Sequence, residues 1–180
     1  MKHIILGVTG SVAAYKAAEL ANRFTKDGHA VHVIMTAAAQ KFITPITFQT
    51  LTKRKTYTEQ FDEFIYEDVR HIALAQQADL VLIAPATANV IAKLAAGIAD
   101  DMLTTVLLAV REKPVLIAPA MNTAMYENPI TRENIARLTR FGYEFIEPRE
   151  ARLACGDLGR GALADVDVIA ARVTRLLEEG

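Results

Sequence analysis

The chain's only cysteine, Cys155, is a candidate for reactive chemistry. It lies in a charged segment from Leu153 to Gly161 that holds three glycines within six residues. The nearby Arg152 and Arg160 could favour the thiolate, so this thiol could act as a nucleophile or an acid. A segment of this composition is typical of a loop, and functional loops often act as lids. An incidental thiol in a surface loop is the alternative interpretation.

A glycine turn, Gly7-Val8-Thr9-Gly10-Ser11, separates the first apolar run from the first helical pattern. Glycines let a backbone approach a ligand closely, and hydroxyls beside helix-terminal N–H groups can hold a phosphate. A tight turn with a serine cap would have the same sequence. The turn lacks the full dinucleotide fingerprint and the Lys-Ser/Thr ending of a P-loop, which disfavours a P-loop NTPase.

The second apolar run ends Met35-Thr36-Ala37-Ala38-Ala39, with no acidic residue after it. A dinucleotide site would place Asp or Glu there to bind the adenosine ribose. A mononucleotide such as FMN, with one phosphate and a flat apolar ring, suits these small residues better.

Two strand ends repeat nearly the same sequence. Residues 82–89 read LIAPATAN and residues 116–122 read LIAPAMN. Each has a strand pattern, then Pro-Ala, then polar residues. Because ligands of open α/β sheets gather at the carboxyl ends of strands, the two ends predict one shared crevice.

Polar side chains near these strand ends have ordinary roles as well as functional ones. Asn89 and Asn122 could simply cap the helices that follow. His71 opens a helical pattern, where it could exchange protons or be an ordinary surface or buried histidine. Met121 and Met125 could equally fill the core.

The elements that must position these residues alternate along the chain. Strands are predicted at residues 3–8, 30–35, 80–84, 115–118 and 143–146, and helices at 11–27, 72–77, 88–96 and 131–141. Continuous apolar strands separated by helices indicate a parallel sheet covered on both faces. We therefore expect an α/β fold, a doubly wound, Rossmann- or flavodoxin-like three-layer sandwich. No linker divides the chain, which predicts one domain over 1–180 with a lid loop at about 149–163.

Composition limits the function classes. A hydrophobic content of 52% and 180 residues exclude a disordered chain, and a net charge of −1 gives no basic field for nucleic acid. The apolar runs are too short to span a membrane. One cysteine excludes an intrachain disulfide and a multi-cysteine metal site, and no signal-peptide pattern is seen, which favours the cytoplasm.

Four segments together resemble the homo-oligomeric flavin-containing cysteine decarboxylases. They are residues 7–16, the turn at 85–89, Pro119-Ala120-Met121-Asn122 and Ala154-Cys155-Gly156-Asp157. The last two are the specific motifs, and the resemblance covers nearly the whole chain. It is greatest to the stand-alone bacterial branch that decarboxylates 4′-phospho-N-pantothenoyl-L-cysteine to 4′-phosphopantetheine in coenzyme A biosynthesis. Where many relatives continue Gly-x-Gly-Arg-Met after the lid cysteine, residues 159–163 read Gly-Arg-Gly-Ala-Leu.

The resemblance implies FMN as the cofactor, a small-molecule substrate and no metal, nucleic acid or membrane partner. It implies a homotrimer or a dodecamer of trimers, with each site completed by a neighbouring subunit. The implied catalytic residues are His71, Asn122 and Cys155, and the implied substrate contacts are Asn122, Met121 and Gly156. The implied FMN-binding residues are Gly10, Ser11, Val12, Thr36, Phe42, Ala86, Thr87, Ala88, Asn89 and Ala120.

The implied reaction is redox-neutral. Flavin oxidises the substrate thiol to a thioaldehyde. CO2 is lost, and the electron pair of the broken C–C bond stays on the substrate as an enethiolate. The reduced flavin then returns the hydride to the enethiol. In this hypothesis His71 is the base that assists thiol oxidation, Asn122 fixes the carboxylate and Cys155 returns a proton.

Four other functions compete with this hypothesis. A peptidyl-cysteine decarboxylase of the lantibiotic type would use the same flavin and Asn122. A flavin-dependent prenyltransferase would have no use for a Cys155 lid. A non-catalytic flavin-binding regulatory protein would lack the catalytic groups that are present here. A flavodoxin-type electron carrier would usually be acidic.

Overall fold

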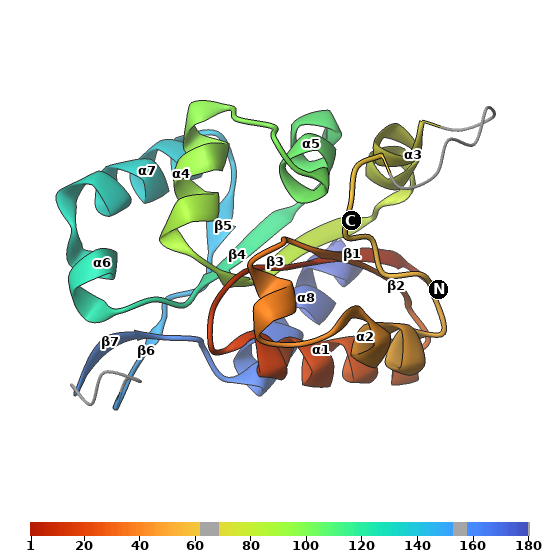
Figure 1. Cartoon of the computed structure of the whole chain (residues 1–180), viewed down its shortest axis with the longest axis horizontal. Coiled ribbons are helices and arrows are strands. Elements are labelled where there is room, and N and C mark those ends of the chain that lie inside the picture. The colour runs from red at the N-terminus through yellow and green to blue at the C-terminus, as the bar shows by residue number, and fades with distance from the viewer. Residues whose placement is uncertain (62–68, 153–157, 180) are drawn as a thin grey trace.

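A five-stranded parallel sheet forms the centre of the molecule (Figure 1). The computed structural model describes residues 1–61, 69–152 and 158–179. The strands are β1 (His3–Val8), β2 (Ala30–Met35), β3 (Leu80–Ala86), β4 (Val115–Pro119) and β5 (Glu144–Phe145). Their order is β2-β1-β3-β4-β5, and every pairing between neighbours is parallel. This is the flavodoxin-like order, so the predicted fold class is confirmed.

Four of the strands are buried along their whole length, which explains their continuous apolar sequences. Only His3 at the start of β1 is partly exposed among them. A strand covered on both faces has no polar side to alternate with. The edge strand β5 is shorter than the predicted 143–146 and half-buried.

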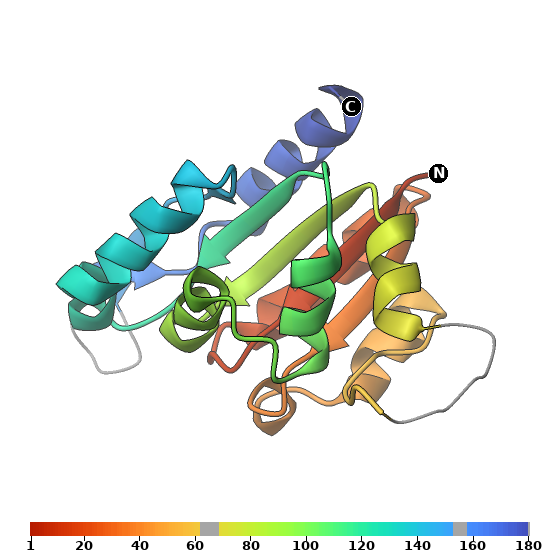
Figure 2. The same ribbon diagram turned by 90° about the horizontal axis from the view of Figure 1, so that it is seen from above.

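Helices cover both faces of the sheet, as the two views show (Figures 1 and 2). One face packs against α1 (Ala14–Lys26), α2 (Pro45–Thr52) and α8 (Val166–Glu179). The other packs against α3 (Arg70–Gln77), α4 (Ala88–Ala96), α5 (Met102–Ala109) and α7 (Pro129–Arg140). Alternate residues of β1, Ile4 and Ile5, lie in the two separate cores, as the period of a strand requires.

Several helices were not predicted from the sequence: α2, α5, α8 and the short α6 (Thr123–Glu127), besides the 3-10 turn η1 (Ala39–Lys41). Helix α5 reads MLTTVLLA and is buried at five of its eight positions, so it lacks the polar face that marks a helix in sequence. Among the helices of the described residues, none is long and apolar enough to cross a bilayer.

The predicted loop at 149–163 is wrong at both of its ends. Strands β6 (Arg149–Arg152) and β7 (Leu158–Ala162) pair there as an antiparallel hairpin, outside the main sheet. Pairing between β6 and β7 supplies backbone hydrogen bonds to these two strands despite Gly159 and Gly161. Cys155 and Gly156 lie outside the described residues, so their predicted roles are not tested here.

Candidate active site

A cavity of about 960 Å³ lies at the carboxyl ends of the strands. It is lined by the β1–α1 turn, the residues after β2, the β3–α4 turn, the β4–α6 turn and the hairpin. The first and third of these flank the point where the strand order reverses, which is where doubly wound sheets bind ligands. Its volume is at the upper end of the range of ligand pockets, about 300–1,000 Å³.

Most of the residues that the sequence predicts for the site meet at this cavity. Eight of the ten predicted FMN residues line it, namely Gly10, Ser11, Val12, Thr36, Thr87, Ala88, Asn89 and Ala120. Met121 and Asn122, predicted to contact the substrate, line it as well.

Three predicted residues lie elsewhere. Ala86 is fully buried in β3, and Phe42 is half-exposed just after η1, so neither is among the lining residues. His71 is half-buried in the first turn of α3, which packs against α5, and it does not line the cavity either.

Thr9 holds two walls of the cavity together instead of facing a ligand. Its hydroxyl donates to the carbonyl of Pro85 at 2.7 Å and accepts from the N–H of Thr87 at 3.0 Å. Thr9 is completely buried, so the expectation that its hydroxyl holds a phosphate is wrong. The neighbouring Gly10 packs so closely that a Cβ there would lie 2.5 Å from the Cβ of Ala38.

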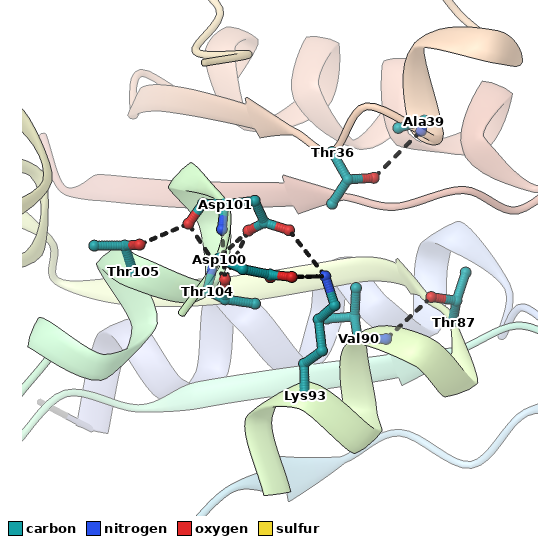
Figure 3. A network of polar contacts seen from close by, with 9 residues as sticks. All are labelled: Thr36, Ala39, Thr87, Val90, Lys93, Asp100, Asp101, Thr104 and Thr105. Carbon is teal, nitrogen blue, oxygen red and sulfur yellow. Dashed lines mark hydrogen bonds and ion pairs between the residues drawn. The ribbon is translucent and has the colours of Figure 1, made fainter. Parts of the chain in front are cut away.

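Two threonine hydroxyls fix their own loops at the edge of the cavity (Figure 3). Thr36 accepts from the N–H of Ala39 at 3.2 Å, and Thr87 caps α4 by accepting from the N–H of Val90 at 3.3 Å. A hydroxyl that accepts a bond still has its own hydrogen to donate, so both remain suited to a ligand oxygen. Thr87 rather than Asn89 is the cap of α4.

Asn122 is held in place by the helix that it caps. Its side-chain oxygen Oδ1 accepts from the N–H of Ala124 at 2.8 Å at the start of α6. The capping role expected for an asparagine is therefore present, and it orients the amide at the wall of the cavity.

The hairpin packs onto this same turn. The N–H of Met121 donates to the carbonyl of Gly161 at 2.9 Å. A Cβ at Gly161 would lie 2.2 Å from the carbonyl oxygen of Met121, and one at Gly159 would lie 2.3 Å from Oγ1 of Thr123. Both glycines are therefore needed for the close approach between the hairpin and the Asn122 turn.

Four charged residues at the cavity were missed from the sequence: Lys16, Lys93, Asp101 and Arg149. Lys93 follows Asn89 by four residues in α4, so helical spacing could have placed it on the same face.

The polar network around Lys93 joins α4 to α5 (Figure 3). The ammonium of Lys93 contacts Asp100 at 2.7 Å and Asp101 at 3.9 Å. Its hydrogen bond lowers the pKa of the Asp100 carboxyl. Asp101 forms a reciprocal capping box with Thr104 and so fixes the start of α5. Lys93 and Asp101 thus line one side of the cavity while their charged groups already contact other protein groups.

Comparison with known proteins places this fold and site in a family. The family described as Flavoprotein matches residues 1–178. A probable phosphopantothenoylcysteine decarboxylase of Streptococcus mutans serotype c is 53% identical over 177 residues, 98% of this chain and 99% of the relative. The coenzyme A biosynthesis bifunctional protein CoaBC of Bacillus subtilis is 49% identical over 93% of this chain, and the match spans 41% of that longer protein.

Solved structures agree with these matches. A PPC decarboxylase mutant complexed with pantothenoylaminoethenethiol superimposes with a TM-score of 0.88 and 34% identity, covering 99% of both chains. The FMN-dependent cysteine decarboxylase SpaF gives a TM-score of 0.83 and 32% identity over 98% of this chain and 97% of its own. The resemblance predicted from the sequence motifs is thus confirmed, and the chain belongs to the Flavoprotein family.

Proposed function

We propose that this chain is an FMN-dependent carboxy-lyase that converts 4′-phospho-N-pantothenoyl-L-cysteine to 4′-phosphopantetheine in coenzyme A biosynthesis. The observation that carries the proposal is the meeting of the predicted flavin residues and Asn122 in one cavity at the strand ends. The 53% identity to a probable phosphopantothenoylcysteine decarboxylase supports this substrate over a peptide. The proposal takes residues 1–180 as one decarboxylase domain and keeps the cytoplasmic location expected from the sequence.

The residues present fit FMN. Small side chains at Ala37, Ala38, Ala88 and Ala120 leave room for a flat ring, and the Ser11 turn offers a site for a phosphate. When bound, FMN would oxidise the substrate thiol and later return the hydride. The protein's part is to bind, orient and exchange protons.

Asn122 is proposed to orient the substrate carboxylate. Its Oδ1 accepts from the N–H of Ala124, and the amide nitrogen is the donor group that would contact a carboxylate. A carboxylate held in one orientation keeps the breaking C–C bond aligned with the developing electron sink, which lowers the entropic part of the barrier.

His71 is proposed to serve the site of a neighbouring subunit. It does not line the cavity of its own chain. Val69 just before α3, Ile72 in α3 and Leu108 in α5, the helix that packs against α3, are exposed apolar side chains. Such side chains suit a subunit interface. This supports the expected homotrimer or dodecamer of trimers. Cys155 stays in the proposal as the proton donor expected from the sequence.

Mass spectrometry of the purified protein, supplied with FMN and 4′-phosphopantothenoyl-L-cysteine, tests the proposal. The expected result is loss of CO2 and appearance of 4′-phosphopantetheine. A peptide with a C-terminal cysteine serves as the competing substrate. Turnover of that peptide alone would transfer the assignment to a peptidyl-cysteine decarboxylase, and absence of both turnover and flavin binding would favour the non-catalytic function.

A further inference from the structure

The β6–β7 hairpin separates the main cavity from a second, outer hollow. Successive residues of a strand point to opposite faces. Arg149 and Ala151 of β6 line the main cavity, whereas Glu150 between them lines the outer hollow. The outer hollow has a volume of about 630 Å³ and is also lined by Arg160 of β7 and Tyr126 of α6. Because both faces of the hairpin border open space, its position over the cavity depends on how it is attached to the rest of the chain.

Tyr126 attaches the base of the hairpin to α6. Its hydroxyl donates to Oε2 of Glu147 at 2.9 Å, two residues before β6 begins. The Tyr126 side chain is only 3% exposed, and the guanidinium of Arg132 in α7 lies 5.0 Å from the centre of its ring. Burial and the neighbouring Glu147 raise the pKa of Tyr126, so the hydroxyl keeps its proton and remains a donor.

The other strand of the hairpin is attached to the same stretch of chain. The N–H of Met121 donates to the carbonyl of Gly161 at 2.9 Å, and Gly159 packs against Thr123. Between Met121 and Thr123 lies Asn122, which caps α6. One strand is thus attached at the start of α6, and the chain that enters the other strand is attached further along the same helix. Two separate attachments prevent the hairpin from pivoting about either one, which fixes its spacing from Asn122.

We propose that Tyr126 is a positioning residue of the decarboxylase, which acts through Glu147 to hold the hairpin at the correct distance from Asn122. The inference rests on the proposed function, in which Asn122 binds the substrate carboxylate. Tyr126 is not among the residues that line the main cavity, so its effect on the reaction is indirect. Its loss should affect the substrate and spare the FMN-binding turns after β1 and β3, because those turns form a different wall of the cavity.

Tyr126→Phe tests this role because it removes the hydroxyl and keeps the ring beneath Arg132. Without the bond, only a fraction of the molecules hold the hairpin in the arrangement that binds substrate, and the apparent affinity falls by that fraction. We expect KM for phosphopantothenoylcysteine to rise roughly 5- to 10-fold, with kcat and the dissociation constant of FMN each within about twofold of wild type. A merely structural loss would reduce the amount of active enzyme, and therefore kcat, without changing KM.

Glu147→Ala removes the other partner of the same bond from an exposed position. It should reproduce the rise in KM, and the double variant should be no worse than either single variant, because all three lack the same interaction. Tyr143→Phe is the matched control. Tyr143 is half-buried beside β5, does not line the cavity and makes no hydrogen bond through its hydroxyl to any residue that the structure describes. Its kinetic constants should equal those of the wild type.

Hydrogen exchange measures the attachment of the hairpin without turnover. The N–H of Met121 is protected by its bond to Gly161 in the hairpin. Mass spectrometry of the peptide that contains Met121 should therefore show faster exchange in Tyr126→Phe than in Tyr143→Phe.

Unchanged KM in both Tyr126→Phe and Glu147→Ala, or unchanged exchange of the Met121 peptide, overturns the role of Tyr126 and leaves the proposed function intact when the wild-type protein turns over substrate. Wild-type protein that binds FMN but releases no CO2 from phosphopantothenoylcysteine overturns both proposals.

Discussion

Replacing Asn122 with aspartate separates its structural role from its proposed chemical one. Asparagine and aspartate are equally good helix caps, so Asn122→Asp keeps the bond that its oxygen accepts from the N–H of Ala124. What it loses is the amide nitrogen, the only part of the side chain that can donate to a carboxylate. Because the cap is kept, we expect the free energy of unfolding to change by less than the roughly 1 kcal/mol that loss of a helix cap costs.

The expected effect on catalysis is much larger. Losing hydrogen bonds to a charged group costs about 1.5–3 kcal/mol. Two carboxylates about 4 Å apart at an effective dielectric constant of 20 repel by up to about 4 kcal/mol. Partial relief by movement or protonation leaves about 3–4 kcal/mol, which is a fall in kcat/KM of roughly 10²- to 10³-fold.

Asn128→Asp is the matched control for this measurement. Asn128 caps α7 in the same way, accepting from the N–H of Ile130 at 2.9 Å, but does not line the cavity. The assay is steady-state CO2 release at saturating FMN, with chemical denaturation of each variant alongside. A kcat/KM for Asn122→Asp within threefold of that for Asn128→Asp would refute the assignment of Asn122 to the substrate carboxylate.

Three further variants test other parts of the structure. Gly161→Ala places a Cβ 2.2 Å from the carbonyl oxygen of Met121, so we expect the hairpin to be displaced and kcat/KM to fall at least tenfold while FMN absorbance is retained; unchanged turnover would contradict this packing. Thr87→Val removes the cap of α4, which should cost about 1 kcal/mol in urea denaturation and weaken FMN binding in a fluorescence titration. Burial lowers the pKa of His32 to about 4 from an ordinary value near 6.5, so the unfolded chain binds more protons between these values. Stability should therefore fall by about 2 kcal/mol as the pH drops from 7 to 4, and His32→Gln should show a smaller pH dependence in urea midpoints.

The sequence predicts the centre of the fold well because the four long strands are buried on both faces. Their continuous apolar runs show neither the period of an amphipathic helix nor the alternation of a half-exposed strand. The parallel arrangement then follows from the helices between them. Helix α5 was not predicted because five of its eight positions are buried, so its sequence lacks a polar face. The β6–β7 hairpin was not predicted because glycines are uncommon in strands. Here Gly159 and Gly161 allow close contact with the Asn122 turn.

Some residues of the candidate site can be predicted from the sequence, and others depend on how the chain folds. Turn motifs at strand ends identify Gly10, Thr87 and Asn122, since the carboxyl ends of parallel strands must converge. The contact between Lys93 and Asp100 crosses from α4 to the loop before α5, and pairing of this kind depends on where a loop returns in space. The position of His71 is likewise a property of the folded chain, because helical periodicity does not say which side of the sheet a helix covers.

The glycine turn shows why a motif residue need not be a ligand residue. Thr9 lies between Gly7 and Gly10, yet its hydroxyl is buried and joins the β1 turn to Pro85 and Thr87 at the β3 turn. Since these are the two turns that flank the switch point, Thr9 fixes the width of the opening between them. Ser11, which follows directly, is then held at the wall of the cavity while its Oγ accepts only a long bond of 3.3 Å from the N–H of Ala13. The buried hydroxyl sets the geometry, and the half-buried Ser11 beside it lines the cavity.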